Sequence, residues 1–97
     1  MRPNIIISQD GKEVSEINFG IVQVGTTKSL DIEVKNMGDA ILFDIAYSIP
    51  HPDVEIKSSP SKLGPSESGT ISLKYTPAED REEGLRIKLN IKGVYVV

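Results

Sequence analysis

Apolar residues recur at every second position in three stretches of this chain. The stretches are 30–34, 71–75 and 85–91, and polar or charged residues fill the positions between. Strict alternation places one set of side chains in a core and the other in water, as half-buried antiparallel strands require. A helix over 79–92 does not fit, because helical geometry would spread these apolar residues around its axis. The pattern therefore predicts β-structure.

Shorter apolar segments and turn residues divide the rest of the chain. Gly20 interrupts one of these segments, which predicts a bulge or a strand that changes sheets. Turns are expected at Asp10-Gly11 and at 36–39. Further strands are expected at 4–8, 17–24, 41–48 and 53–57. Length and spacing together predict one domain over 1–97, an all-β, immunoglobulin-like antiparallel β-sandwich of about seven strands.

The inward positions of the expected strands define a candidate core. No disulfide can join the two sheets, because the chain has no Cys. Aliphatic and aromatic packing must therefore hold the sheets together. The expected core residues are Phe19, Leu30, Ile32, Val34, Phe43, Ile45, Ile71, Leu73, Tyr75, Leu85, Ile87 and Leu89.

Charge and composition argue against several functions. A net charge of −3 gives no overall attraction to phosphate, and aromatic residues, at 5%, supply few stacking platforms, so we expect no nucleic-acid partner. No apolar run approaches the roughly 20 residues that span a bilayer, so we expect no membrane insertion. No signal peptide is recognised, but the compartment stays open, because a domain cut from a longer protein would carry no such segment.

His51 is the one histidine, and a hydrolase would use it as a general base. Its nucleophile would be Ser48, Ser58 or Ser59. However, His51 lies between two prolines in an expected loop, and the chain has no Gly-x-Ser-x-Gly motif. We therefore expect no catalytic residues and no enzymatic activity.

Seven carboxylates are candidate calcium ligands. Calcium needs several oxygen ligands that converge on one point, and the chain has no Asp-x-Asp-x-Asp-Gly loop. A solvated acidic surface is the simpler interpretation, so we expect no metal and no cofactor. The carboxylates are Asp39, Asp44, Asp53, Glu79, Asp80, Glu82 and Glu83.

Basic residues form a candidate face on the expected strand at 85–92. Arg86, Lys88 and Lys92 share its outward side, and Lys74 is expected on a neighbouring strand. One interpretation is a stripe that binds phosphate. A second is a solvated face with cross-strand pairs to Asp31 or Glu33. A third is protection of a sheet edge against pairing with other chains.

The end of the chain is apolar, β-prone and uncharged. Its last residues are Val94, Tyr95, Val96 and Val97. One interpretation is a final strand packed within the same sandwich. The other is that this segment, or the edge beside it, pairs with another chain by strand addition, including self-association.

The order of the turns and core residues resembles the ASH-type immunoglobulin-like domains, relatives of the major sperm protein fold. CARDB-type modules of archaeal and bacterial surface proteins show related patterns. The resemblance covers roughly residues 17–93. The motifs are Phe19-Gly20-x-Val22-x-Val24-Gly25, Asn36-x-Gly38, Leu63-Gly64-Pro65-x-Glu67-Ser68, Tyr75-Thr76-Pro77 and Ile91-Lys92-Gly93.

The resemblance implies a non-catalytic role in assemblies at cilia, centrosomes, envelopes or cell surfaces. It also implies that Phe19 anchors the core and that Asn36 forms a turn with Gly38. These families often have two strands after the Tyr-Thr-Pro motif, whereas the alternation here predicts one. The last strand is then expected at 94–97, or one sheet ends a strand early.

Together these features predict a structural or protein–protein interaction module that contacts protein partners through a sheet edge and loops. Its partner is not specified by the sequence. An accessory domain of a cell-surface or carbohydrate-active protein is one alternative, and it requires exposed aromatic side chains. A small hydrolase is the other, and it requires a nucleophile paired with His51.

Overall fold

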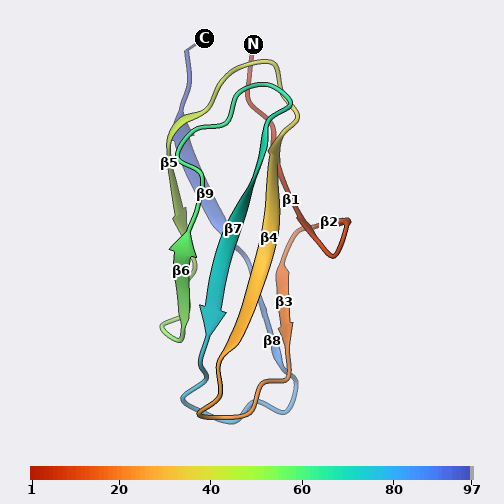
Figure 1. Cartoon of the computed structure of the whole chain (residues 1–97), viewed down its shortest axis with the longest axis vertical. Coiled ribbons are helices and arrows are strands. Elements are labelled where there is room, and N and C mark those ends of the chain that lie inside the picture. The colour runs from red at the N-terminus through yellow and green to blue at the C-terminus, as the bar shows by residue number, and fades with distance from the viewer. Residues whose placement is uncertain (97) are drawn as a thin grey trace.

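The computed structural model describes residues 1–96, which form nine strands and no membrane-spanning helix (Figure 1). Every pairing between the strands is antiparallel. The predicted fold class, an all-β sandwich, is confirmed. The strands are β1 (Ile5–Gln9), β2 (Lys12–Val14), β3 (Ile17–Gly20), β4 (Lys28–Asn36), β5 (Phe43–Ser48), β6 (Val54–Ser58), β7 (Ser68–Tyr75), β8 (Leu85–Ile87) and β9 (Asn90–Val94).

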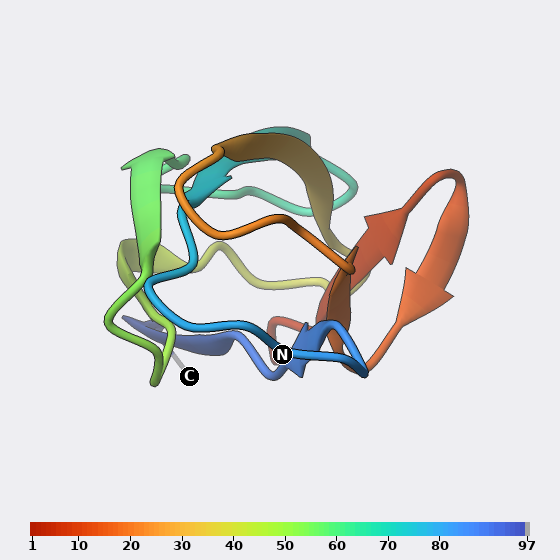
Figure 2. The same cartoon turned by 90° about the horizontal axis from the view of Figure 1, so that it is seen from below.

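The strands make two layers that face each other across the core. One layer is a five-stranded sheet of order β2-β1-β4-β7-β6, and the other contains the pairs β3-β8 and β5-β9. Seen from below, β4 and β7 lie across the core from β8 and β9, and the β1-β2 hairpin projects to one side (Figure 2). The central pairing of β4 with β7 runs from Lys28↔Tyr75 to Lys35↔Ser68. It joins two of the alternating stretches of the sequence.

The core fills the space between these layers. Phe19 is fully buried, and its ring centroid lies 5.2 Å from that of Tyr75. Nine of the expected core residues are buried, whereas Leu30, Ile45 and Phe43 are partly exposed. The nine are Phe19, Ile32, Val34, Ile71, Leu73, Tyr75, Leu85, Ile87 and Leu89. Ile17, Ala40, Leu42 and Leu63 are buried as well, although the alternation did not identify them.

The strand expected at 41–48 is formed from Phe43, but the expectation that Phe43 faces the core is wrong. Leu42 is buried, whereas Ile41 is 39% exposed. The pairing of β5 with β9 shifts register between Phe43 and Ala46, and Asp44 lies at φ 49°. A bulge inserts a residue into one strand and so changes which side chains face inward. The inward-facing residues therefore begin at Leu42, just before β5, and continue within β5 from Ile45.

The prediction of one strand over 85–92 is also wrong. β8 ends at Ile87 and β9 begins at Asn90. β8 pairs with β3, whereas β9 pairs with β5. Two strands therefore follow Pro77, as the family resemblance implies. The bulge predicted at Gly20 is confirmed, because the β3-β8 register shifts between Asn18 and Gly20.

The final strand expected at 94–97 is not formed. β9 already ends at Val94, and Tyr95 and Val96 follow it outside any strand. Val97 lies outside the described residues. Because the run at 85–92 supplies both late strands, no separate strand is needed at the end of the chain.

Asn36 is a fully buried polar residue that ties three segments together. Its Oδ1 accepts hydrogen bonds from the backbone N–H of Asn4, at 3.1 Å, and of Gly38, at 2.9 Å. Its Nδ2 donates to the carbonyl oxygens of Ala40, at 2.7 Å, and Leu63, at 3.0 Å. A buried amide with every bond made is stabilising, so Asn36 does more than form a turn.

The segment before β1 runs against the turn that Asn36 organises. The N–H groups of Met37 and Asp39 donate to the carbonyl oxygens of Asn4 and Arg2. A Cβ on Gly38 would lie 2.2 Å from the Arg2 carbonyl oxygen. Only a residue without a side chain fits this close approach of two backbones.

Tyr47 is half-buried in β5, and its hydroxyl donates to the carbonyl oxygen of Pro60 at 2.8 Å. Burial raises the pKa of Tyr47 from 10.0 to about 12. The fold favours the protonated phenol, so this stabilisation is complete below pH 10 and is lost as the pH rises through about 12.

We expect an ultraviolet titration of phenolate to show a late step near pH 12 that Tyr47→Phe removes. Tyr47→Phe also loses the bond to Pro60, which costs about 1 kcal/mol of unfolding free energy. If the difference between the two titrations falls near pH 10 instead, burial does not protect this phenol.

Candidate functional site

A sheet edge presents unpaired backbone N–H and C=O groups, so each edge of this sandwich is a candidate for strand addition. The outer edge of β5 is covered by the chain segment before β7. Leu42 and Leu63 exchange N–H···O bonds of 2.9 and 3.0 Å, and Ile45 N–H donates to the Ser61 carbonyl oxygen at 2.9 Å. This edge is therefore closed.

The outer edge of β3 is covered by a side chain. Gln9 Nε2 donates to the Asn18 carbonyl oxygen at 2.8 Å, and Asn18 N–H donates to Gln9 Oε1 at 2.9 Å. The amide of Gln9 thus occupies both backbone groups of Asn18, much as a neighbouring strand would. The same contact holds the two layers together where the chain crosses from β1 to β3.

The remaining short edges carry charges or few residues. β2 has three residues, of which Lys12 and Glu13 are exposed, and β8 also has only three. β6 has five residues, but Glu55 and Lys57 form an ion pair of 3.6 Å on it. Short, charged edges resist pairing with other chains.

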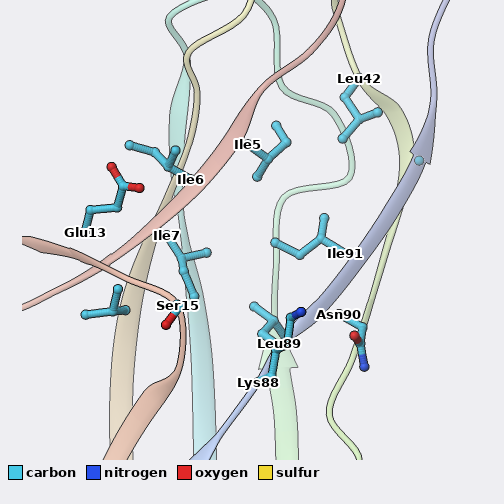
Figure 3. Close-up of a pocket in the computed structure, with 12 residues that line it drawn as sticks. Ile5, Ile6, Ile7, Glu13, Ser15, Leu42, Lys88, Leu89, Asn90 and Ile91 are labelled. Carbon is cyan, nitrogen blue, oxygen red and sulfur yellow. The ribbon is translucent and has the colours of Figure 1, made fainter.

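β9 differs from these strands because one of its edges is open over five residues. Its other edge pairs with β5, and no backbone hydrogen bond of residues 1–96 joins β9 to β1. A groove of about 490 Å³ separates β9 from β1. In Figure 3, Ile5 from β1, Ile91 from β9 and Leu89 just before β9 converge on this space.

The groove has an apolar floor and a mixed rim. Ile5, Ile7, Leu42, Leu89 and Ile91 line it, together with Glu13 and Ser15 on the β2 side and Lys88 and Asn90 on the β9 side (Figure 3). Gly93 also lines the groove, and a Cβ there would lie 2.7 Å from Leu42 Cγ. The missing side chain therefore lets β9 pack closely on Leu42.

The predicted basic face is only partly brought together. Arg86 lies in β8 opposite Asn18, Lys88 lies between β8 and β9, and Lys92 lies in β9 opposite Ala46; all three are exposed. Lys74 lies instead in β7, in the other layer, where it pairs with Ser29 and Glu55. The expectation that Lys74 neighbours the other three is wrong, because β7 lies between β4 and β6 in the five-stranded sheet and pairs with neither β8 nor β9.

The cross-strand pairs expected for the basic face are also not formed. Asp31 and Glu33 lie in β4, where they face Ser72 and Thr70 of β7. Asp31 Oδ1 accepts a hydrogen bond of 2.9 Å from the Ser72 hydroxyl. Both carboxylates therefore belong to the layer opposite β8 and β9.

The predicted partner segment begins at the end of β9. Val94 pairs with Phe43 and is 57% exposed, and Val96 is 79% exposed. Tyr95 is the most exposed aromatic side chain. Val96 lines a mostly apolar hollow with Met1, Ile41 and Phe43, at the end of the sandwich where both termini lie (Figure 1).

His51 lies at the opposite end, in the loop before β6. Its Nδ1 accepts a hydrogen bond of 3.1 Å from Asp53 N–H, and its ring packs edge-on against Tyr75 at 5.8 Å. No hydrogen bond within residues 1–96 joins it to a serine. Ser58 is the last residue of β6, about 13 Å along the strand from its start, and Ser59 follows it; Ser48 is exposed on β5.

The candidate calcium ligands are spread over the molecule. Within residues 1–96, no three Asp, Glu or His side chains gather closely enough to hold a metal ion. Two of the carboxylates already bind backbone groups. Asp39 accepts from Arg2 N–H at 2.8 Å, and Asp53 accepts from Ala78 N–H at 3.0 Å.

Sequence reasoning did not find the β9 groove. Its two walls come from opposite ends of the chain, and its floor residues Ile5 and Ile91 are ordinary strand residues in sequence. The one local signal is Gly93, because glycine inside a strand often marks a close approach of another segment. The motif Ile91-Lys92-Gly93 contained it, but nothing in the sequence showed which segment approaches.

A family model described as ASH, "Abnormal spindle-like microcephaly-assoc'd, ASPM-SPD-2-Hydin", matches residues 3–91. The match includes the walls of the groove except for Gly93 and the residues after it. Searches of curated proteins and of solved structures gave no significant match.

Proposed function

The chain belongs to the ASH family, a non-enzymatic module type, and from this premise we propose that it binds another protein by strand addition at the open edge of β9. In this function an extended segment of the partner enters the groove between β9 and β1. Its backbone pairs with Asn90–Val94, and alternate side chains cover the apolar floor. The module would then contribute to an assembly by binding and would not catalyse a reaction.

The observation that carries the proposal is the contrast between β9 and the other edges. Side chains, a covering segment or paired charges protect β3, β5 and β6. β9 leaves five residues open beside an apolar groove. Main-chain hydrogen bonds supply affinity in strand addition, and a groove for alternate side chains supplies specificity.

The proposal is tested with a synthetic peptide of about eight residues, the length of an ordinary strand, in which Val alternates with Ser. We expect the peptide to slow amide hydrogen exchange in Asn90–Val94. Ser15→Trp places a bulky ring at the exposed rim of the groove and should abolish this protection. Thr70→Trp adds the same ring on the outer face of β7 and should leave it intact.

Two outcomes would overturn the proposal. In one, no exchange rate in β9 responds to the peptide. In the other, Ser15→Trp and Thr70→Trp weaken binding equally while circular dichroism shows both variants folded. Light scattering on the free protein tests self-association, since a dimer that already protects β9 would make a second copy the partner.

A further inference from the structure

Two exposed side chains, one in β9 and one just before it, are basic and form no ion pair within residues 1–96. They are Lys92 and Lys88, respectively. Across the existing β5-β9 pairing, Lys92 faces Ala46 and Asn90 faces Ser48. The edge of β6 is different, because its Lys57 already pairs with Glu55.

These two lysines restrict which strands can pair with β9. Opposite charges directly across a strand pair are stabilising, and like charges are destabilising. A second copy of β9 would bring the same lysines to the interface, so self-pairing is disfavoured. A strand with carboxylates at its outward positions would instead neutralise both charges. The lysines thus disfavour strands that carry basic residues at these positions and favour acidic ones.

The floor of the groove restricts the remaining positions. Ile5, Leu89 and Ile91 point into the space that the added strand would cover (Figure 3). Side chains alternate between the two faces of a strand, so every second residue of the occupant faces this floor and is apolar. Its other residues stand beside Lys88 and Lys92.

We infer that the partner of β9 is an extended segment in which acidic residues alternate with apolar ones. This inference rests on the proposed strand addition and specifies the chemistry of its ligand. The charges of the module set its selectivity, and the apolar floor fixes the register, because a shift by one residue would place carboxylates against Ile5 and Ile91.

Three synthetic peptides of about eight residues test the inference. In each, Val occupies alternate positions, and the positions between are all Glu, all Ser or all Lys. Titration followed by nuclear magnetic resonance of the labelled protein gives each affinity. We expect the Glu peptide to bind about tenfold more tightly than the Ser peptide, the Lys peptide to bind most weakly, and added salt to narrow the difference.

Charge reversal locates the effect. The double variant Lys88→Glu/Lys92→Glu should invert the order of the Glu and Lys peptides. The double variant Lys28→Glu/Lys74→Glu makes the same change in net charge on the other sheet and should preserve the order. An equal effect of the two double variants would assign the selectivity to net charge and overturn the inference.

The remaining outcomes separate the two proposals. If all three peptides bind β9 equally well, the inference is wrong and strand addition stands. If none perturbs β9, strand addition at this edge is wrong and the inference falls with it. A free protein that is already a β9-paired dimer would make the occupant a second copy and would contradict the inference.

Discussion

Replacing Asn36 by Ala is expected to lower the free energy of unfolding by about 2–4 kcal/mol, because four backbone groups lose a hydrogen bond to this fully buried amide. These are the N–H groups of Asn4 and Gly38 and the carbonyl oxygens of Ala40 and Leu63. An unsatisfied buried group costs about 1–3 kcal/mol. The sum is smaller here, because the two N–H groups are only part-buried and the Leu63 carbonyl keeps its bond from Leu42 N–H. The loss is a large part of the total free energy of unfolding, which is about 5–15 kcal/mol for a typical domain.

Urea unfolding followed by circular dichroism measures this loss, because the chain has no Trp for fluorescence. Asn90→Ala is a matched control, since Asn90 is exposed and its change should stay within about 0.5 kcal/mol. A cost below about 1 kcal/mol for Asn36→Ala would show that the amide network contributes little to stability.

Ile32→Ala is expected to cost about 2–5 kcal/mol, because Ile32 is fully buried and its removal leaves a cavity between the layers. Leu30→Ala should cost about half as much, since Leu30 is partly exposed on the same strand and burial energy scales with buried area. The same unfolding experiment compares them. Equal costs would mean that Leu30 is as deeply packed as Ile32.

The alternation in β4 and β7 predicted these strands correctly, because both are interior strands of a sheet that has one buried face and one solvent-exposed face. There, burial alone decides which residues are apolar. β5 was predicted out of phase at its start because Asp44 adopts a left-handed backbone conformation that usually favours glycine. The presence of an Asp in the sequence does not by itself predict such a bulge.

The division of 85–92 into two strands could not be predicted from its pattern. Leu85, Ile87, Leu89 and Ile91 all face inward, so the alternation continues across the break. What changes at the break is the neighbouring strand, because β8 pairs with β3 and β9 pairs with β5. The alternation of apolar residues does not show which strand lies beside them. Asn36 was similarly recognised only as a turn residue, because its buried contacts come from residues far away in sequence.

The candidate site depends even more on distant segments. The sequence pointed to the end of the chain and to Lys88 and Lys92 as separate features. The fold places the lysines along the open edge of β9 and leaves Tyr95 and Val96 outside the strand. An open edge is defined by the strand that is missing beside it, and no local pattern encodes that.

The central claim is that β9 accepts a strand, and nuclear Overhauser contacts between a bound peptide and the protein test it most directly. For the peptide in which Glu alternates with Val, strand addition predicts cross-strand backbone contacts with Asn90–Val94 and side-chain contacts with Ile5. Contacts to β6, or to the loop that holds His51, with none to β9 would contradict it.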